Sequence, residues 1–161
     1  MTDFHELYTR YARDVHRFAL YLSCDPALAD DITSETFLRA WSSATPIREA
    51  TVKAYLFTIV RNLYLTEQTR AARHVELNDS LPSSAASQDI RIEHKGAVTA
   101  VLKALRVLPE IDRAALLMRT QDGMSYEEIA QALQLTLSSA KVKVHRARIK
   151  LASVIERTVS S

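Results

Sequence analysis

The residues best suited to binding chemistry are cations gathered near the C-terminus. Between residues 136 and 150 the chain has no carboxylate and five cations: Lys141, Lys143, Arg146, Arg148 and Lys150. If this stretch is the second helix of a helix-turn-helix, its charge suits a polyanion such as DNA. The alternative is a solvated basic face on an ordinary helix, because scattered cations alone occur on many surface helices.

The residues before this stretch have the spacing of a helix-turn-helix. Pro109 is expected in the first turn of a helix that Gly123 ends. Ser125, followed three residues later by a glutamate, forms a capping box that begins the next helix. Gln134-Leu135 supplies the turn, and Thr136 is the expected cap of the last helix. This context favours DNA binding over the solvated-face interpretation.

A helical wheel divides the last helix into two faces. The inner face is apolar and should pack on the preceding helices, with Leu137, Ala140, Val144, Ala147, Leu151 and Ile155. The opposite face carries Ser138, Ser139, Val142, Lys143 and Arg146. Its small N-terminal residues would let the helix enter a major groove, where serine, valine and arginine can contact base edges and thymine methyls. Phosphates are expected at the borders, near Lys141, Arg148 and Lys150.

The elements that must position this helix are also helical. Only two glycines and four prolines interrupt the 161 residues, and apolar residues recur at three- and four-residue steps over residues 3–23, 27–42, 51–73 and 90–108. The polar run LNDSLPSSAASQD has the composition of a flexible linker. We therefore predict an all-α protein of two small helical domains, residues 1–73 and 90–161, joined by a flexible linker at 74–89.

The N-terminal half carries both acidic and basic groups. Residues 1–73 have nine bases and nine acids, and four of the acids lie close together: Asp25, Asp30, Asp31 and Glu35. Arg61, Arg70 and Arg73 follow later. Two partners are therefore indicated, one for each charge. Alternatively, the acids near the start of the second helix serve only to complement its dipole.

Several other classes of function find no support. The lone Cys24 has no internal disulfide partner, which fits a reducing cytoplasm, and we interpret it as a small buried hydrophobe rather than a redox switch. We expect no secretion signal and no membrane insertion, because the N-terminus is polar and no apolar run reaches about 20 residues. No Cys–His spacing or glycine-rich phosphate loop suggests an enzyme, a metal or another cofactor.

The quoted motifs resemble one known family. The segment LPEIDRAALLMRTQDGMSYEEIAQALQLTLSSAKVKVHRARIKL is similar to the promoter-binding domain of sigma-70 initiation factors, in particular the extracytoplasmic-function (ECF) group. DDITSETFLRAW resembles the polymerase-binding helix of that group, and AYLFTIVRNLYL resembles its promoter-melting helix. The resemblance implies a cytoplasmic, non-enzymatic factor that binds core RNA polymerase and directs it to promoters.

The resemblance also implies three binding surfaces. The surface for the coiled coil of the largest polymerase subunit would contain Asp30, Asp31, Thr33, Glu35, Thr36, Leu38 and Arg39. The surface for the −10 element would contain Lys53, Tyr55, Arg61, Asn62, Arg70 and Arg73. The −35 element would be read by Ser138, Ser139, Val142 and Arg146, with phosphates bound by Arg113, Lys141, Lys143 and Arg148. Three aromatic residues of the AYLFTIVRNLYL segment can alternatively be core residues: Tyr55, Phe57 and Tyr64. For Phe57 and Tyr64 we favour the core interpretation.

Further partners follow from the same resemblance: the flap of the polymerase, promoter DNA, and an anti-sigma protein wedged between the two domains. The competing hypothesis is a stand-alone helix-turn-helix regulator, which usually dimerises on a palindrome. The acidic and then apolar N-terminal module distinguishes the two hypotheses, because a simple repressor has no use for it.

Overall fold

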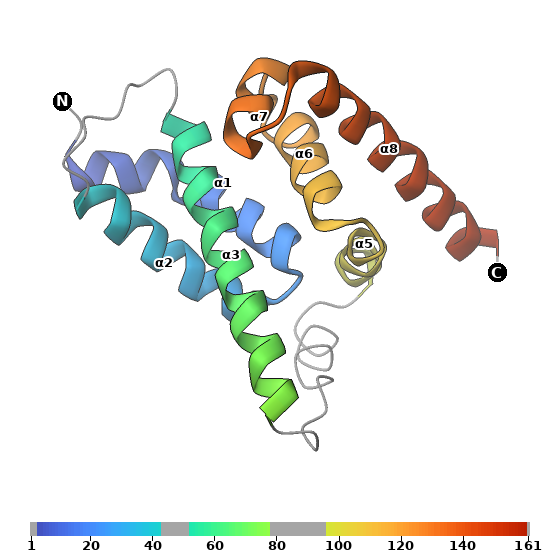
Figure 1. Ribbon diagram of the computed structural model, residues 1–161, viewed down its shortest axis with the longest axis horizontal. Coiled ribbons are helices and arrows are strands. Elements are labelled where there is room, and N and C mark those ends of the chain that lie inside the picture. The colour runs from blue at the N-terminus through green and yellow to red at the C-terminus, as the bar shows by residue number, and fades with distance from the viewer. Residues whose placement is uncertain (1–2, 43–51, 78–95, 161) are drawn as a thin grey trace.

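The structure, a computed structural model, describes residues 3–42, 52–77 and 96–160, which form helices and turns without any strand. In the N-terminal half the described residues form α1 (Phe4–Ser23), α2 (Pro26–Ser42) and α3 (Val52–Leu77), which Figure 1 labels. The C-terminal half contains α5 (Ala97–Arg106), α6 (Glu110–Thr120), α7 (Tyr126–Leu133) and α8 (Leu137–Ser160). The all-α prediction is confirmed.

Short polar side chains set the boundaries of the first two helices. The Glu6 backbone N–H donates to Asp3 Oδ1 at 2.8 Å, which caps α1. Cys24 ends this helix in the left-handed region, with φ of 57°. Asp25 Oδ1 then accepts from the backbone N–H groups of Ala27 and Leu28, at 3.1 and 3.3 Å. Asp25 therefore caps the second helix.

The three N-terminal helices pack around aromatic side chains. Phe18 and Phe57 are fully buried and stack with their ring centroids 4.3 Å apart. Tyr64 is also buried, so the interpretation of Phe57 and Tyr64 as core residues is confirmed. Trp41 of α2 is 50% exposed, and its ring packs edge-on against Phe4, with the ring centroids 5.5 Å apart.

The predicted linker begins within a helix. Helix α3 continues four residues past 73, to Leu77, and this last turn is exposed. Residues with good helix propensity, such as Ala71 and Glu76, let the helix extend beyond its packing partners. Residues 78–89 of the predicted linker and residues 90–95 of the predicted next helix lie outside the described part of the chain.

The helix-turn-helix consists of α7 and α8, and α6 packs against both of them. The predicted capping box at Ser125 is present, because its hydroxyl accepts from Glu128 N–H at 3.1 Å while the Glu128 carboxylate accepts from Ser125 N–H at 2.9 Å. Gln134 makes the turn with φ of 56°, and Thr136 accepts from the backbone N–H of Ser139 at 3.1 Å. Pro109, predicted inside the first turn of α6, is its N-cap.

The inner face of α8 is shorter than predicted. Ala140, Val144 and Ala147 are fully buried, whereas Leu137 and Ile155 near the two ends are partly exposed. Helix α6 is 11 residues long and α8 is 24, so the C-terminal turns of α8 extend past the helices that could cover them. This accounts for the wrong assignment of Ile155 to the core.

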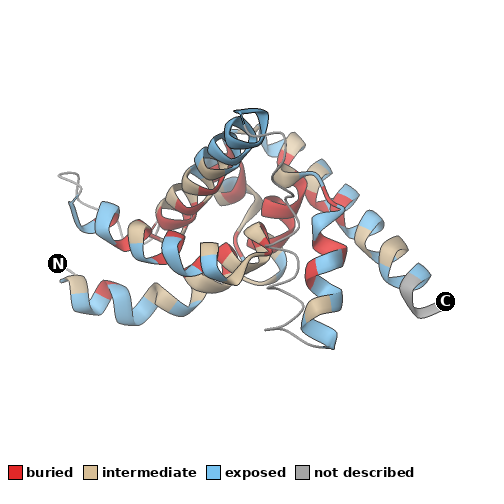
Figure 2. Cartoon of the chain, turned by 90° about the horizontal axis from the view of Figure 1, so that it is seen from below, coloured by how far each residue is buried: buried red, intermediate tan, exposed pale blue. Residues whose placement is uncertain are grey.

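The two halves pack against each other as well as within themselves. Cys24 is fully buried, as predicted, and its thiol donates to the Leu102 carbonyl of α5 at 3.4 Å. The Thr58 hydroxyl of α3 donates to the Ala132 carbonyl of α7 at 3.4 Å. Figure 2 shows buried residues on the inward sides of helices from both halves. None of the helices in the described part of the chain is long and apolar enough to cross a membrane.

Candidate nucleic-acid interface

The outer face of α8 is open to solvent. Ser138, Val142 and Arg146 are exposed, with 56% of Val142 accessible, and Ser139 is half-buried beside the Thr136 cap. Among the expected phosphate-binding residues, Lys141 and Arg148 are exposed and Lys143 is half-buried. The structure therefore leaves the four residues predicted to read bases on an accessible helix, as a major-groove contact requires.

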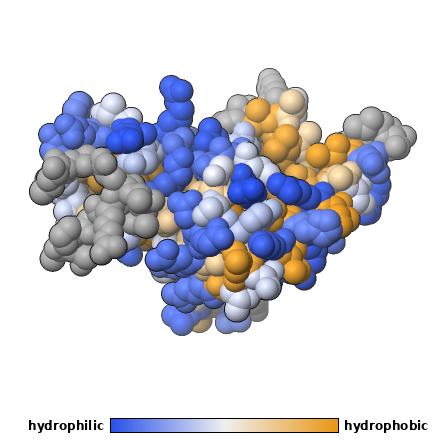
Figure 3. All heavy atoms as spheres, turned by 90° about the horizontal axis from the view of Figure 1, so that it is seen from above, coloured by the Kyte–Doolittle hydropathy of each residue, from blue (hydrophilic) through white to orange (hydrophobic). Residues whose placement is uncertain are grey.

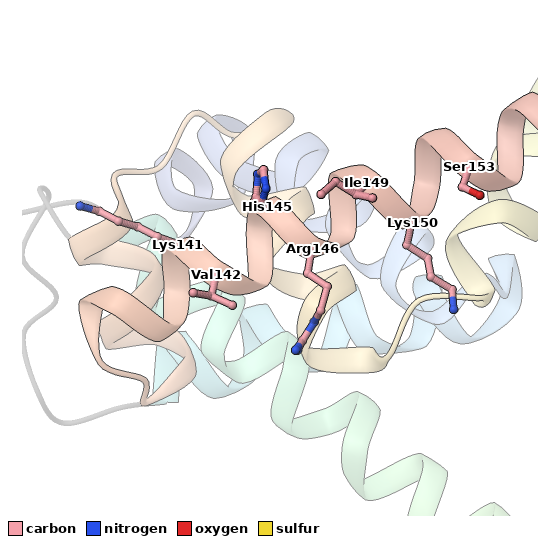
Figure 4. Close-up of a pocket in the computed structure, with 7 residues that line it drawn as sticks. All are labelled: Lys141, Val142, His145, Arg146, Ile149, Lys150 and Ser153. Atoms are coloured by element: carbon pink, nitrogen blue, oxygen red, sulfur yellow. The ribbon is translucent and has the colours of Figure 1, made fainter.

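A shallow groove runs along the same helix. Its volume is about 690 Å³, and it is lined by Lys141, Val142, His145, Arg146, Ile149, Lys150 and Ser153 (Figure 4). Figure 3 shows hydrophobic atoms beside hydrophilic ones on the side of the molecule where α8 runs. His145, Ile149 and Ser153 were not among the predicted site residues, although their steps of three and four residues from Val142 place them on this side.

Arg146 is fixed by a carboxylate from another helix. Its Nε donates to Asp112 Oδ2 at 2.9 Å and its Nη2 donates to Asp112 Oδ1 at 3.0 Å. The Asp112 side chain is only 2% exposed, whereas the Arg146 side chain is 57% exposed. The hydrogen bond to Asp112, followed by the charge of that carboxylate, raises the pKa of Arg146 above its ordinary value. Arg146 therefore stays cationic and is held from one side only.

Arg113 lies away from the exposed face, contrary to its predicted role as a phosphate contact. It is buried between the two halves, where Nη2 donates to the Tyr64 hydroxyl at 3.2 Å and Nη1 donates to the Leu105 carbonyl at 3.4 Å. Its guanidinium also lies 5.9 Å from the centroid of the Tyr64 ring. DNA cannot reach this side chain in the observed arrangement. Its sequence position gave no sign of this, because Tyr64 is 49 residues away.

The residues of α3 predicted to bind the −10 element fall into two groups. Asn62, Arg70 and Arg73 are exposed, and Arg70 pairs with Glu67 on the same helix at 3.0 Å. In contrast, Arg61 donates through Nε and Nη2 to the Glu110 carboxylate of α6, at 2.7 and 2.8 Å. Tyr55, predicted for the same surface, is half-buried at the edge of the core.

Lys53 belongs to a second ionic contact between the halves. Its Nζ lies 3.2 Å from Asp14 Oδ2 and 3.8 Å from Asp122 Oδ1, and Arg17 donates to Asp122 Oδ1 at 3.1 Å. Burial raises the pKa of the Asp122 carboxyl, and this effect outweighs the hydrogen bond from Arg17 and the charge of Lys53, which lower it. Sequence reasoning missed Glu110 and Asp122, because no local pattern pairs them with residues 49 and 105 positions away.

Helix α2 presents a charged surface with a buried back. Asp30, Asp31, Leu38 and Arg39 are exposed, and half-buried Glu35 accepts from Arg39 Nε at 3.1 Å. His16 Nε2 lies 2.9 Å from Asp30 Oδ1. The remaining two predicted residues do not reach this surface. Thr33 and Thr36 are buried, and each hydroxyl donates at 2.7 Å to a backbone carbonyl one turn earlier.

The fold is that of a helix-turn-helix protein with an additional three-helix module. Residues 7–74 match the family model described as sigma-70 region 2, and residues 99–151 match the one described as sigma-70, region 4. These matches disfavour a stand-alone helix-turn-helix regulator, which has no use for region 2. In the described residues, no group of acidic, histidine and cysteine side chains could hold a metal ion.

Named relatives support the same family. The chain is 34% identical over 140 residues to the ECF RNA polymerase sigma factor EcfG of Rhodopseudomonas palustris, covering 86% of this chain and 77% of that protein. It is 30% identical over 145 residues to the ECF RNA polymerase sigma factor SigL of Mycobacterium tuberculosis, covering 88% and 82%. The chain belongs to the ECF group of sigma-70 RNA polymerase sigma factors.

Two further comparisons extend over almost the whole chain. The ECF RNA polymerase sigma factor SigM of Bacillus subtilis is 28% identical over 157 residues, covering 96% of both proteins. The fold is similar to that of the sigma factor RpoE from Bartonella quintana, whose structure was solved in complex with the anti-sigma factor NepR. That match has a TM-score of 0.77 at 24% identity and covers 95% of this chain and 96% of the other.

Proposed function

We propose that this sigma factor binds core RNA polymerase through α2 and directs it to promoters that α8 and α3 recognise at the −35 and −10 elements. The observation that carries this proposal is the open face of α8, on which Ser138, Val142 and Arg146 remain accessible within a helix-turn-helix. The protein acts as a non-enzymatic adaptor in the cytoplasm, because its surfaces supply binding and positioning to a reaction that the polymerase catalyses.

The exposed part of α2 is the contact for the coiled coil of the largest polymerase subunit. Asp30, Asp31, Glu35 and Arg39 supply charge, while Leu38 supplies an apolar centre with 57% of its surface accessible. An exposed leucine surrounded by charged groups is suited to a protein interface with an apolar centre and a polar rim. Thr33 and Thr36 support this surface from inside by packing α2 on the core. The flap of the polymerase is the corresponding contact of the C-terminal half.

The −35 element is read by the outer face of α8. Ser138, Ser139, Val142 and Arg146 lie where base edges would be, and Lys141, Lys143 and Arg148 bind the phosphates on either side. Arg113 is left out of this set, because it is buried and already bonded to Tyr64 and Leu105.

The −10 element is bound by α3 in two stages. Asn62, Arg70 and Arg73 are accessible and can hold the unpaired strand, with cations on its backbone and the amide on a base. Arg61 is paired with Glu110 of the C-terminal half, and Lys53 lies between Asp14 of α1 and Asp122 of the C-terminal half. Both cations reach DNA only after the contact between the halves opens. An anti-sigma protein that stabilises the closed arrangement would therefore inhibit the factor, and the solved complex of the sigma factor RpoE with NepR supports a partner of this kind.

Binding to core polymerase tests the α2 assignment. Asp31→Lys combined with Glu35→Lys should abolish co-purification with core enzyme and leave the circular dichroism spectrum unchanged, because both side chains face outward. The matched control is Glu76→Lys with Glu156→Lys, which makes the same charge change at exposed sites outside α2 and should leave co-purification intact. Unchanged co-purification of the first variant would contradict this surface.

A further inference from the structure

The pairing of Arg146 with Asp112 leaves part of the guanidinium unused. A guanidinium has five N–H donors. The pair uses the Nε–H and one Nη2–H, both of which point to the buried carboxylate of α6. Both Nη1–H groups and the second Nη2–H are left over. The end of the guanidinium, with one N–H from each of its two terminal nitrogens, is thus directed away from Asp112.

This remaining edge has the donor pattern that one base requires. Guanine presents O6 and N7 in the major groove as two adjacent acceptors, which two parallel N–H groups of an arginine bind together. Adenine offers an acceptor and a donor at the same edge, so it cannot accept both. Arg146 lies one turn after Val142 on the exposed side of α8, and Figure 4 shows its side chain extending outward from this helix. A guanine is therefore the base that matches this donor edge.

We propose that Asp112 is a positioning residue that fixes Arg146 for recognition of a guanine in the −35 element, an inference that rests on the proposed reading of that element by α8. A free arginine side chain samples many rotamers and must be ordered when it binds a base. The fork to Asp112 orders it in advance. Since Asp112 is buried and neutralised by Arg146, its charge does not repel the phosphates of the incoming DNA.

The test measures base discrimination by the full chain with core polymerase. Promoters with each of the four base pairs at every −35 position are transcribed with wild type, Asp112→Asn, Arg146→Ala and the double variant. Arg146→Ala should lose about 10-fold of the preference for guanine at one position. Asp112→Asn keeps the volume but replaces one acceptor oxygen by an NH2 donor, so the two-oxygen fork is lost. This variant should lose several-fold of the preference for guanine at the same position, and the double variant should match Arg146→Ala.

The controls separate positioning from folding and from the wider proposal. Glu110 lies in the same turn of α6 as Asp112, but it pairs with Arg61 instead of Arg146. Glu110→Gln should therefore leave discrimination between bases at −35 unchanged. If Asp112→Asn lowers the melting temperature strongly, Asp112→Glu serves instead, because it retains the charge but displaces the fork and should still weaken the preference. The positioning role would be overturned if a folded Asp112 variant lost transcription equally on every promoter, or if it still preferred guanine as strongly as wild type. Absence of any dependence on the −35 sequence in wild type would instead overturn the proposed function of α8.

Discussion

The two helices proposed to bind DNA each hold one arginine on a carboxylate of α6, but they leave it exposed to different extents. Arg146 of α8 and Arg61 of α3 each donate two hydrogen bonds to a carboxylate of α6, Asp112 and Glu110 respectively. The Arg146 side chain remains 57% exposed, whereas the Arg61 side chain is only 18% exposed. In the proposed function, the pair within the C-terminal half prepares an arginine for DNA, while the pair between the halves withholds one. The same bidentate chemistry has a different consequence, depending on whether it lies within a unit or across the contact between two units.

The largest expected effect separates the two arginines by promoter element. Arg146→Ala should reduce the free energy of promoter binding by about 1–3 kcal/mol at a single −35 position, because a bidentate base contact is lost. Arg61→Ala should leave −35 discrimination unchanged and weaken binding of a −10 single strand. Competition binding on −35 and −10 substitution series distinguishes these outcomes. If either variant weakened binding at both the −35 and the −10 element, the two arginines would not have separate roles.

Removal of the interdomain partner should release Arg61. Glu110→Gln replaces two charge-assisted hydrogen bonds by at most one weaker interaction, so the contact between the halves should lose about 1 kcal/mol, equivalent to a roughly fivefold larger open fraction. We expect tighter binding of a −10 oligonucleotide, measured by fluorescence anisotropy. Glu156→Gln is the matched control, because Glu156 is exposed at the far end of α8. Weaker oligonucleotide binding by Glu110→Gln would show that Glu110 supports the DNA-binding state.

Cys24 provides an internal measure of the same opening. The thiol is buried against the Leu102 carbonyl, and burial raises its pKa despite the nearby charges of Arg113 and Arg106. Labelling by a disulfide reagent should be slow in wild type, because both access and the thiolate fraction are low. Glu110→Gln should accelerate labelling about as much as it increases the open fraction. Rapid labelling of wild type would show that the halves are already apart.

The smallest expected effect concerns pH. The raised pKa of Asp122 means that the folded protein binds this proton more tightly than the unfolded chain. Its contribution to the free energy of unfolding should therefore fall as pH rises from the ordinary carboxyl pKa, about 4, through the raised value. Urea unfolding across this pH interval gives the free energy of unfolding of wild type and of Asp122→Asn. The value for wild type minus the value for the variant should decrease with rising pH. An increase would mean that the ion pairs with Arg17 and Lys53 outweigh burial.

Features that depend on a few neighbouring residues could be predicted from the sequence. Ser125 and Thr136 cap helices because a short polar side chain reaches a backbone N–H three residues away, and such contacts are visible as spacing. The outer face of α8 follows from helical periodicity in the same way. The burial of Thr33 and Thr36 was missed because their surroundings depend on the packing of α2 against other helices.

The contacts between the halves could not be predicted. Arg113 and Tyr64, like Arg61 and Glu110, are 49 positions apart in the chain, and no sequence pattern specifies such a pair. Each cation looked available for DNA because periodicity reports which face a residue occupies, but not what another unit places against that face. Asp112 was hidden for a related reason. An acid in the first turn of a helix also suits the helix dipole, so its sequence position did not reveal its bond to Arg146.

Start-site mapping tests the central claim most directly. Core polymerase, alone and with this chain, transcribes a library of genomic fragments, and the 5′ ends of the transcripts are sequenced. The proposed function predicts new start sites that share an upstream motif in two parts, at −35 and −10. The −35 part should contain a guanine that the Arg146→Ala variant no longer requires. An absence of transcripts beyond those of core polymerase alone, or start sites that share no such motif, would contradict the account.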